Sequence, residues 1–279
     1  MAGHHAGGEV SQGALMEHND QVIAQFTQEA EAFASARHIQ DVQALDLLLQ
    51  VSGAGAQDRC LDVACGPGIV ACHFAKVVLA ATGIDLTPAM LEQARKLQRS
   101  HGLDNLAWDL GDATALPYSN ASFSIVTSRY AFHHLQDPGA ALAEMVRVCS
   151  AGGTLAVMDL CVCEDVEKAA RFNRMERHHD PSHVRALSLT QHHRLFALND
   201  LPRPSESFHR INVSLSRLMQ SSFPSAEDAL AAEAIVRESL HDDGMGAFTR
   251  KHGEDIVFSY PIVVLVARKA AAALRARSP

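Results

Sequence analysis

Paired cysteines, long apolar runs and an excess of positive charge are all missing from this sequence of 279 residues. Its six cysteines form no Cys-x-x-Cys pair, which indicates reduced thiols rather than a disulfide framework. The longest apolar run, at residues 260–267, is far shorter than the ~20 residues that cross a bilayer. We therefore expect a cytoplasmic protein with no membrane span.

Charge and aromatic content limit the choice of partner. The formal net charge of −8 argues against nucleic acid, because proteins that bind polyanions normally carry a basic patch and a basic balance. Aromatic residues make up only 5% of the chain, which disfavours a pocket of stacked rings for large flat substrates. These features favour a small-molecule substrate, and they leave open a homodimer.

Strand-like and helix-like segments alternate through the first half of the chain. The predicted strands are 59–64, 81–85, 106–110, 123–128 and 153–160, and the predicted helices between them are 69–78, 88–100 and 138–149. This period is typical of crossover units, in which a parallel sheet is covered by helices on both faces. The sequence therefore predicts an α/β fold.

The two ends of the chain have other patterns. Residues 1–13 resemble a loose leader, and residues 20–50 have helical periodicity. The alternation lapses over the polar, partly helical stretch 161–204. Beyond it the pattern predicts strands at 208–216 and 256–267 and a helix at 226–239.

A glycine-containing turn, LDVACGPGIVACHFA at 61–75, joins the first predicted strand to its helix. Gly66, Gly68 and Ala71 fit the loose nucleotide-binding pattern G-x-G-x-x-A, in which glycine lets ligand atoms approach the backbone. The same pattern also occurs in tight turns without a ligand. Its position after the first strand favours the ligand-binding interpretation.

Acidic residues at three successive strand ends select the ligand. Asp62 would repel the pyrophosphate of a dinucleotide but suits a ligand with an ammonium group. Asp85 ends the second strand, where such folds place a ribose-binding acid; its alternative role is a helix cap, for which Thr87 is the better candidate. Asp112 can accept a hydrogen bond from the adenine amino group. Together they fit S-adenosylmethionine.

Four ordered motifs resemble class I S-adenosylmethionine-dependent methyltransferases, and the likeness is greatest to the branch with the ubiquinone and menaquinone C-methyltransferases. The motifs are LDVACGPG (61–68), GIDLTPAML (83–91), GDATALPYSNASFSIVTS (111–128) and FHHLQDP (132–138). The resemblance implies a Rossmann-like, seven-stranded, mainly parallel sheet with an antiparallel last strand and a helical substrate-cap insertion. It also implies these divisions: an N-terminal leader and lid helix (1–50), a cofactor-binding domain (51–160), a substrate cap with sheet completion (161–255), and a final strand and tail (256–279).

The resemblance also assigns cofactor contacts. It places the lid-helix residue Phe26 over the cofactor. The contacts that the motifs and the resemblance together predict are Asp62, Ala64, Gly66, Gly68, Asp85, Leu86, Asp112, Ala113 and Ser128.

Catalytic side chains are expected in the loop after the fourth strand. Methyl transfer needs a positioned nucleophile and, for some acceptors, a base. His133 and His134 can accept a proton near neutral pH, although either could instead cap or pack within a short helix. Arg129 could orient an anionic substrate or pair with an acid.

A second histidine cluster, RHHDPSHVR at 177–185, invites a metal interpretation. Pro181 breaks the helix that would align His179 with His183, so we predict no metal site. A substrate-cap loop, with His183 or Arg185 facing the pocket, and a solvated connector are the remaining interpretations.

The sequence thus predicts methyl transfer from S-adenosylmethionine to an oxygen, carbon or nitrogen atom of a small organic molecule, such as a quinone, an isoprenoid or another secondary metabolite. Two alternatives stay open at this point. One is an NAD(P)-dependent oxidoreductase that uses the same glycine turn. The other is a non-catalytic protein that binds S-adenosylmethionine.

Overall fold

The computed structural model describes residues 12–35 and 41–271, so residues 1–11 of the predicted leader lie outside it. Its elements are α1 (Gln12–Ser35), α2 (Val42–Ser52), β1 (Arg59–Val63), α3 (Ile69–Ala75), β2 (Ala80–Asp85), α4 (Pro88–His101), β3 (Leu106–Leu110), β4 (Phe123–Arg129), the 3₁₀ helix η1 (Phe132–His134), α5 (Pro138–Val148), β5 (Cys149–Val162), α6 (Val166–His179), β6 (Leu187–Ser188), α7 (Leu189–Leu198), β7 (Ser205–Ser214), α8 (Leu215–Ser222), α9 (Ala226–Asp242), β8 (Arg250–His252) and β9 (Asp255–Arg268).

One sheet organises these elements, with the strand order β3-β2-β1-β4-β5-β9-β7. Strands β1 to β5 are parallel, and β9 runs antiparallel to both of its neighbours, β5 and β7. The predicted α/β fold and its antiparallel last strand are confirmed. The two short strands β6 and β8, which the pattern did not predict, bring the sheet to nine strands.

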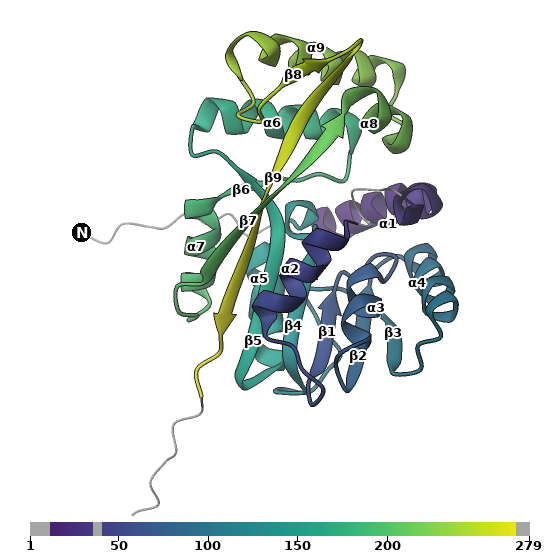
Figure 1. Ribbon diagram of the computed structural model, residues 1–279, viewed down its shortest axis with the longest axis vertical. Helices are drawn as coiled ribbons and strands as arrows, with labels where there is room; N and C mark the ends of the chain where they lie inside the picture. The colour runs from purple at the N-terminus through teal and green to yellow at the C-terminus, as the bar shows by residue number, and fades with distance from the viewer. Residues whose placement is uncertain (1–11, 36–40, 272–279) are drawn as a thin grey trace, which may run out of the picture.

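Helices cover both faces of the sheet (Figure 1). On one face, α2 and α3 bury Leu48 and Phe74 against the strands. On the opposite face, α5 and α7 bury Met145 and Phe196. These side chains have no measurable exposure to solvent, so each face of the sheet has its own apolar core beneath a layer of helices.

A second group of helices forms the cap, which consists of α6, α8, α9 and β8 around the far ends of β7 and β9 (Figure 1). The last residues of β9 pair with β5, from Ile262 to Arg268. Its first residues extend past β5 and pair with β8 and with the end of β7. β9 therefore runs from the cap into the sheet, and β7 pairs with it over this length.

The predicted insertion at 161–204 divides between these two parts. Its first helix, α6, belongs to the cap, but α7 packs on α5 against the sheet. The cap also contains α8 and α9, which lie beyond residue 204 but within the substrate-cap region predicted at 161–255. The helical pattern at 20–50 likewise resolves into two helices: α1 contacts α4 and α8, whereas α2 covers the sheet.

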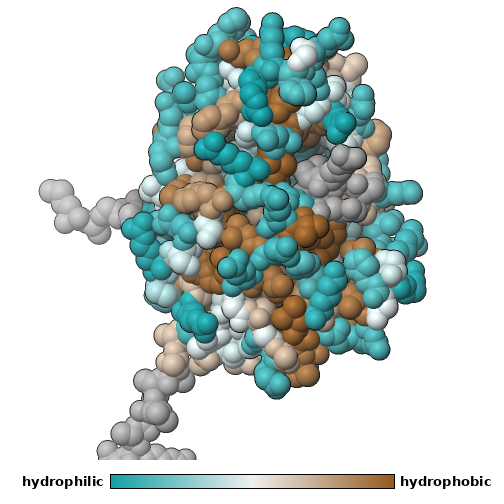
Figure 2. Space-filling view, viewed as in Figure 1, coloured by the Kyte–Doolittle hydropathy of each residue, from teal (hydrophilic) through white to brown (hydrophobic). Residues whose placement is uncertain are grey.

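The surface reflects this construction. Figure 2 shows hydrophilic side chains over much of the cap and hydrophobic ones gathered across the middle of this face, where the cap and the sheet meet. Within the described residues, no helix is long and apolar enough to traverse a bilayer.

Trp108 on β3 packs against two glycines next to the first strand. A Cβ added to Gly83 would lie 2.5 Å from Trp108 Cζ3, and one added to Gly68 would lie 2.4 Å from Trp108 Cη2. The indole Nε1 donates to Gln98 Oε1 at 2.7 Å, which holds the ring in place. Gly68 also has φ of +77°, a conformation that favours glycine. Gly68 thus supports the turn by packing.

We expect Gly83→Ala to destabilise the protein by about 1–3 kcal/mol, because the new methyl group overpacks the indole. Thermal unfolding followed by the fluorescence of the single tryptophan measures this effect. Gly55→Ala is the matched control, since its Cβ would approach nothing closer than Asp58 Oδ2 at 3.8 Å. Equal melting temperatures for Gly83→Ala and the unmodified protein would contradict the packing argument.

Candidate functional site

A cavity opens at the carboxyl ends of β1, β2 and β4, and residues of α1 line it. In Figure 1, α1 lies between the sheet and the cap. Carboxyl ends of parallel strands are the usual ligand-binding edge of such sheets. The wall combines residues of α1 with the glycine turn and with the loops that follow β2, β3 and β4.

The structure brings together most of the residues predicted for the site. The lining contains Phe26, Asp62, Ala64, Gly66, Asp85, Leu86, Asp112, Ala113, Arg129 and His134. Among the described residues, Gly68, Ser128 and His133 do not reach the lining. Gly68 packs on Trp108, Ser128 is buried within β4, and His133 is turned to the interior.

Asp62 lies at the end of β1, 1% exposed. Its Oδ2 accepts a hydrogen bond from Ala71 N of α3 at 3.1 Å. Burial raises the pKa of this carboxyl group to about 7, although the nearby positive charge of Arg129 opposes the rise. A buried acid of this kind gains most from a ligand that brings a positive charge into the cavity.

Asp85 connects the glycine turn to the start of α4. Its Oδ2 accepts from Gly66 N and its Oδ1 from Thr87 N, each at 2.8 Å. Burial raises the pKa of Asp85, and the backbone donors partly offset that rise. Thr87 occupies the N-cap position but makes no side-chain cap bond, so Asp85 also takes part in capping. Each carboxylate oxygen keeps a further lone pair for a ligand hydroxyl group.

Asp112 is tied to the helix above it. Its Oδ2 accepts from Asn19 Nδ2 of α1 at 3.0 Å. Its Oδ1 accepts from the backbone N and the hydroxyl of Thr114, at 2.8 and 2.7 Å. α1 thereby contacts one of the predicted cofactor acids directly.

Two residues that line the cavity have left-handed backbone conformations. Ala64 follows β1 with φ of +54°, and Tyr130 follows β4 with φ of +56°. Such conformations cost non-glycine residues of order 1–3 kcal/mol each and concentrate at functional sites. The guanidinium carbon of Arg129 lies 4.6 Å from the centroid of the Tyr130 ring.

Asp159 on β5 holds the loop after β4. Its Oδ2 accepts from Ala131 N at 3.0 Å and Phe132 N at 2.7 Å, and its Oδ1 lies 2.5 Å from His133 Nδ1. Burial disfavours an imidazolium, but the adjacent carboxylate outweighs it and raises the pKa of His133. The same pair lowers the pKa of Asp159 despite its burial. His133 is therefore the partner of Asp159, and this pairing favours the charged form of its imidazole.

His134 is the histidine of the pair that lines the cavity. Burial and the charge of His133 lower its pKa to about 4, so its imidazole is neutral at pH 7. The ring meets that of Phe26 edge-on, with centroids 5.0 Å apart. His18 Nε2 on α1 bonds to the carbonyl oxygen of His134 at 2.7 Å. His134 therefore has a base-competent form beside the lid helix.

The second histidine cluster does not form a cation site in the part of the chain that is described. His178 bonds to Asp228, and His183 Nε2 lies 2.8 Å from Asn173 Oδ1. His183 is buried outside the cavity lining, and Arg185 is likewise not part of it. The interpretation of these two residues as pocket-facing is therefore wrong.

Sequence reasoning missed several residues of the site. Asn19 and His18 precede the helix that periodicity predicted at 20–50, and the structure includes them because α1 begins earlier, at Gln12. Asp159 sits within a predicted strand, where its charge was the available signal, because an acid amid apolar residues is seldom buried without a partner.

The cavity fits S-adenosylmethionine on its own evidence. A Cβ added to Gly66 would meet no atom within 4 Å, so the turn leaves open space beside the backbone. Among the lining residues, the carboxylates are those of Asp62, Asp85, Asp112 and Asp137, and Arg129 is the permanent cation. This arrangement suits a cationic ligand that also carries a ribose and a carboxylate.

Comparisons with known proteins also lead to a methyltransferase. Residues 61–157 match the methyltransferase domain family. The chain is 32% identical over 176 residues to YcgJ, an uncharacterized methyltransferase of Bacillus subtilis, covering 63% of this chain and 70% of YcgJ. The crystal structure of YcgJ superposes with a TM-score of 0.76 and 26% identity, covering 82% of this chain and 99% of that one.

Shorter matches extend to methyltransferases of known substrate. The chain is 37% identical over 114 residues to the ubiquinone/menaquinone C-methyltransferase UbiE of Bdellovibrio bacteriovorus, covering 40% of this chain and 48% of that protein. It is 36% identical over 100 residues to the ajmaline N-methyltransferase of Rauvolfia serpentina, covering 35% and 34%. For these two relatives the chain spans half of their length or less.

Fold, cavity and relatives lead to the same assignment: the chain belongs to the class I S-adenosylmethionine-dependent methyltransferases, and S-adenosylmethionine is its cofactor.

Proposed function

We propose that the protein methylates an oxygen, carbon or nitrogen atom of a small, largely apolar organic molecule, and that His134 accepts the proton which that atom loses. The observation that carries this proposal is the position of His134, a neutral imidazole in the wall of the cavity that also contains the strand-end acids. The family match favours methyl transfer over both alternatives, a dehydrogenase and a non-catalytic binding protein.

In this proposal the strand-end residues hold the cofactor. Asp62 and Arg129 face the ammonium and carboxylate groups of its amino-acid end, Asp85 takes the ribose hydroxyls, and Asp112 lies toward the adenine. The sulfonium of S-adenosylmethionine supplies the methyl group, so the chain's own task is to orient the acceptor, exclude water and take up a proton.

The acceptor would occupy the side of the cavity that faces α1. Val22, Phe26 and Phe33 line that wall, together with Leu135 from the loop after η1. Apolar side chains there favour an apolar acceptor, and α1 covers it from solvent. The two relatives of known substrate methylate carbon and nitrogen respectively, so the shared core leaves the acceptor atom open. A homodimer also remains a prediction.

Asp85→Ala should weaken the binding of S-adenosylmethionine at least tenfold, or about 1.4 kcal/mol, because the ribose loses its carboxylate partner and the glycine turn loses its anchor. Isothermal titration calorimetry measures the affinity. Asp109→Asn is the matched control: its carboxylate belongs to β3, accepts from Tyr118 and lies outside the cavity lining. Wild-type affinity in Asp85→Ala would remove the ribose assignment.

His134→Gln should lower the turnover number at least about a hundredfold, the lower end of the about 10²–10⁴ that a lost general base costs. Transfer of a radiolabelled methyl group to an acceptor found by screening provides the assay. Affinity for S-adenosylhomocysteine should change less than about twofold. His193→Gln is the control, since His193 pairs with Glu206 away from the cavity. An unchanged turnover number in His134→Gln would show that His134 is not the base.

A further inference from the structure

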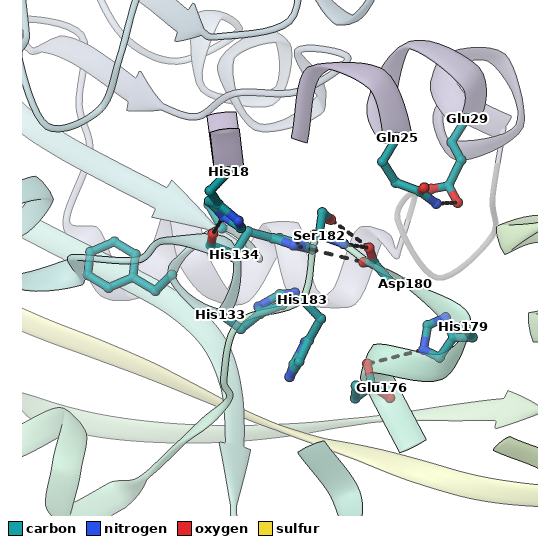
Figure 3. Close-up of polar contacts among 12 residues, drawn as sticks. His18, Gln25, Glu29, His133, His134, Glu176, His179, Asp180, Ser182 and His183 are labelled. Carbon is teal, nitrogen blue, oxygen red and sulfur yellow. Dashed lines mark hydrogen bonds and ion pairs between the residues drawn. The ribbon is translucent and has the colours of Figure 1, made fainter. Parts of the chain in front are cut away.

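His134 receives a side-chain contact from a segment far away in the sequence. After α6 ends, the turn at 180–183 brings Ser182 Oγ to 3.0 Å from His134 Nδ1 (Figure 3). Ser182 Oγ in turn lies 2.5 Å from Asp180 Oδ1, and Asp180 Oδ2 lies 3.8 Å from His134 Nδ1. Ser182 has no exposed surface, so these contacts are sheltered from water.

The number of available hydrogens fixes the direction of these bonds. A serine hydroxyl donates one hydrogen, and an ionised carboxylate can only accept. Asp180 stays ionised, because the surrounding histidines and the bonds from Ser182 lower its pKa in spite of burial. Ser182 must therefore donate to Asp180 and accept from His134. It follows that His134 carries its hydrogen on Nδ1.

In a neutral imidazole, a hydrogen on Nδ1 leaves the lone pair on Nε2. The ring is held in this orientation from several sides. His133 O accepts from Val184 N at 2.9 Å and Arg185 N at 3.0 Å, which joins η1 to the segment after α6. Phe26 packs against the His134 ring from α1. Nε2 is thus the basic atom of a ring that lines the cavity.

We propose that Ser182 and Asp180 are positioning residues that fix the tautomer of His134, so that Nε2 is the atom that accepts the acceptor's proton. This inference rests on the proposed function of His134 as the base.

The acceptor's X–H bond breaks, its proton goes to Nε2, and its electron pair forms the new X–CH₃ bond while the S–CH₃ bond of the cofactor breaks. The imidazolium then donates a hydrogen bond from Nδ1 to Ser182, and Ser182 donates a hydrogen bond to the Asp180 carboxylate. The negative charge of this carboxylate stabilises the cation. His134 finally releases the proton to solvent.

The tautomer can be measured without knowing the acceptor. Protein labelled with ¹⁵N in histidine, with S-adenosylhomocysteine bound, gives long-range ¹H–¹⁵N spectra that distinguish the Nδ1–H and Nε2–H forms, and His134→Gln identifies the signals of His134. The wild-type protein should show the Nδ1–H form. A wild-type ring in the Nε2–H form would overturn the proposal.

Two variants test whether Ser182 and Asp180 fix this tautomer. In the double variant Ser182→Ala/Asp180→Ala, Nδ1 loses both partners, and the Nε2–H form should become populated. Asp180→Asn should shift the tautomer in the same direction. The amide can donate a hydrogen bond to Ser182, and the Ser182 hydroxyl hydrogen is then free to bond to Nδ1. An Nδ1–H form that is unchanged in both variants would contradict the proposal. Circular dichroism and thermal unfolding confirm that each variant is folded.

Ser222→Ala is the matched control. Its hydroxyl is also buried but bonds to the carbonyl oxygen of Leu218 within α8, so the His134 signals should not move. Once an acceptor is known, Asp180→Asn should lower the enzyme's turnover number for that acceptor about tenfold or more. The spectra also separate the tautomer proposal from the proposed function of His134. An Nδ1–H ring in the wild-type protein together with full activity in His134→Gln would support the tautomer proposal but show that His134 is not the base.

Discussion

A carboxylate buried where water cannot reach it must find N–H donors in the protein, and the loops around this cavity are arranged to supply them. Asp62 receives a bond from the first turns of α3, and Asp85 receives bonds from the glycine turn and from the start of α4. Asp159 collects the backbone N–H groups of Ala131 and Phe132. The acids thus determine where each loop leaves the sheet, and the cavity lies between those loops.

Two of these acids, Asp159 and Asp62, differ in the partners that they have. Asp159 is paired with His133 and raises its pKa, whereas the pKa of His134 in the cavity wall is lowered to about 4. Asp62 has no such side-chain partner within bonding distance among the described residues, and burial raises its pKa to about 7. One buried acid therefore organises structure, whereas we propose that the other, Asp62, receives the cationic end of a ligand.

Much of the frame could be predicted from the sequence, because local signals define it. Apolar periodicity located the strands, and acids at strand ends marked the ligand edge, with Asp62, Asp85 and Asp112 all found in the lining. The choice between His133 and His134 could not be made, since adjacent residues differ only in which way the short helix turns them. Ser182 and His134 are separated by 48 positions, and a single sequence carries no signal for such a contact. The division of the insertion between cap and sheet likewise depends on how far β9 extends.

The most direct test of this account is a calorimetric titration with S-adenosylmethionine at pH 7 in two buffers of different ionisation enthalpy. Burial raises the pKa of Asp62 to about 7, so before the cofactor binds, its carboxyl group is about half protonated at this pH. A bound cation lowers that pKa, so binding should release roughly half a proton, and Asp62→Asn should abolish the release. NADH should give no binding heat. Binding of S-adenosylmethionine without proton release, or binding of NADH in its place, would contradict the assignment of Asp62 to the cationic end of the cofactor.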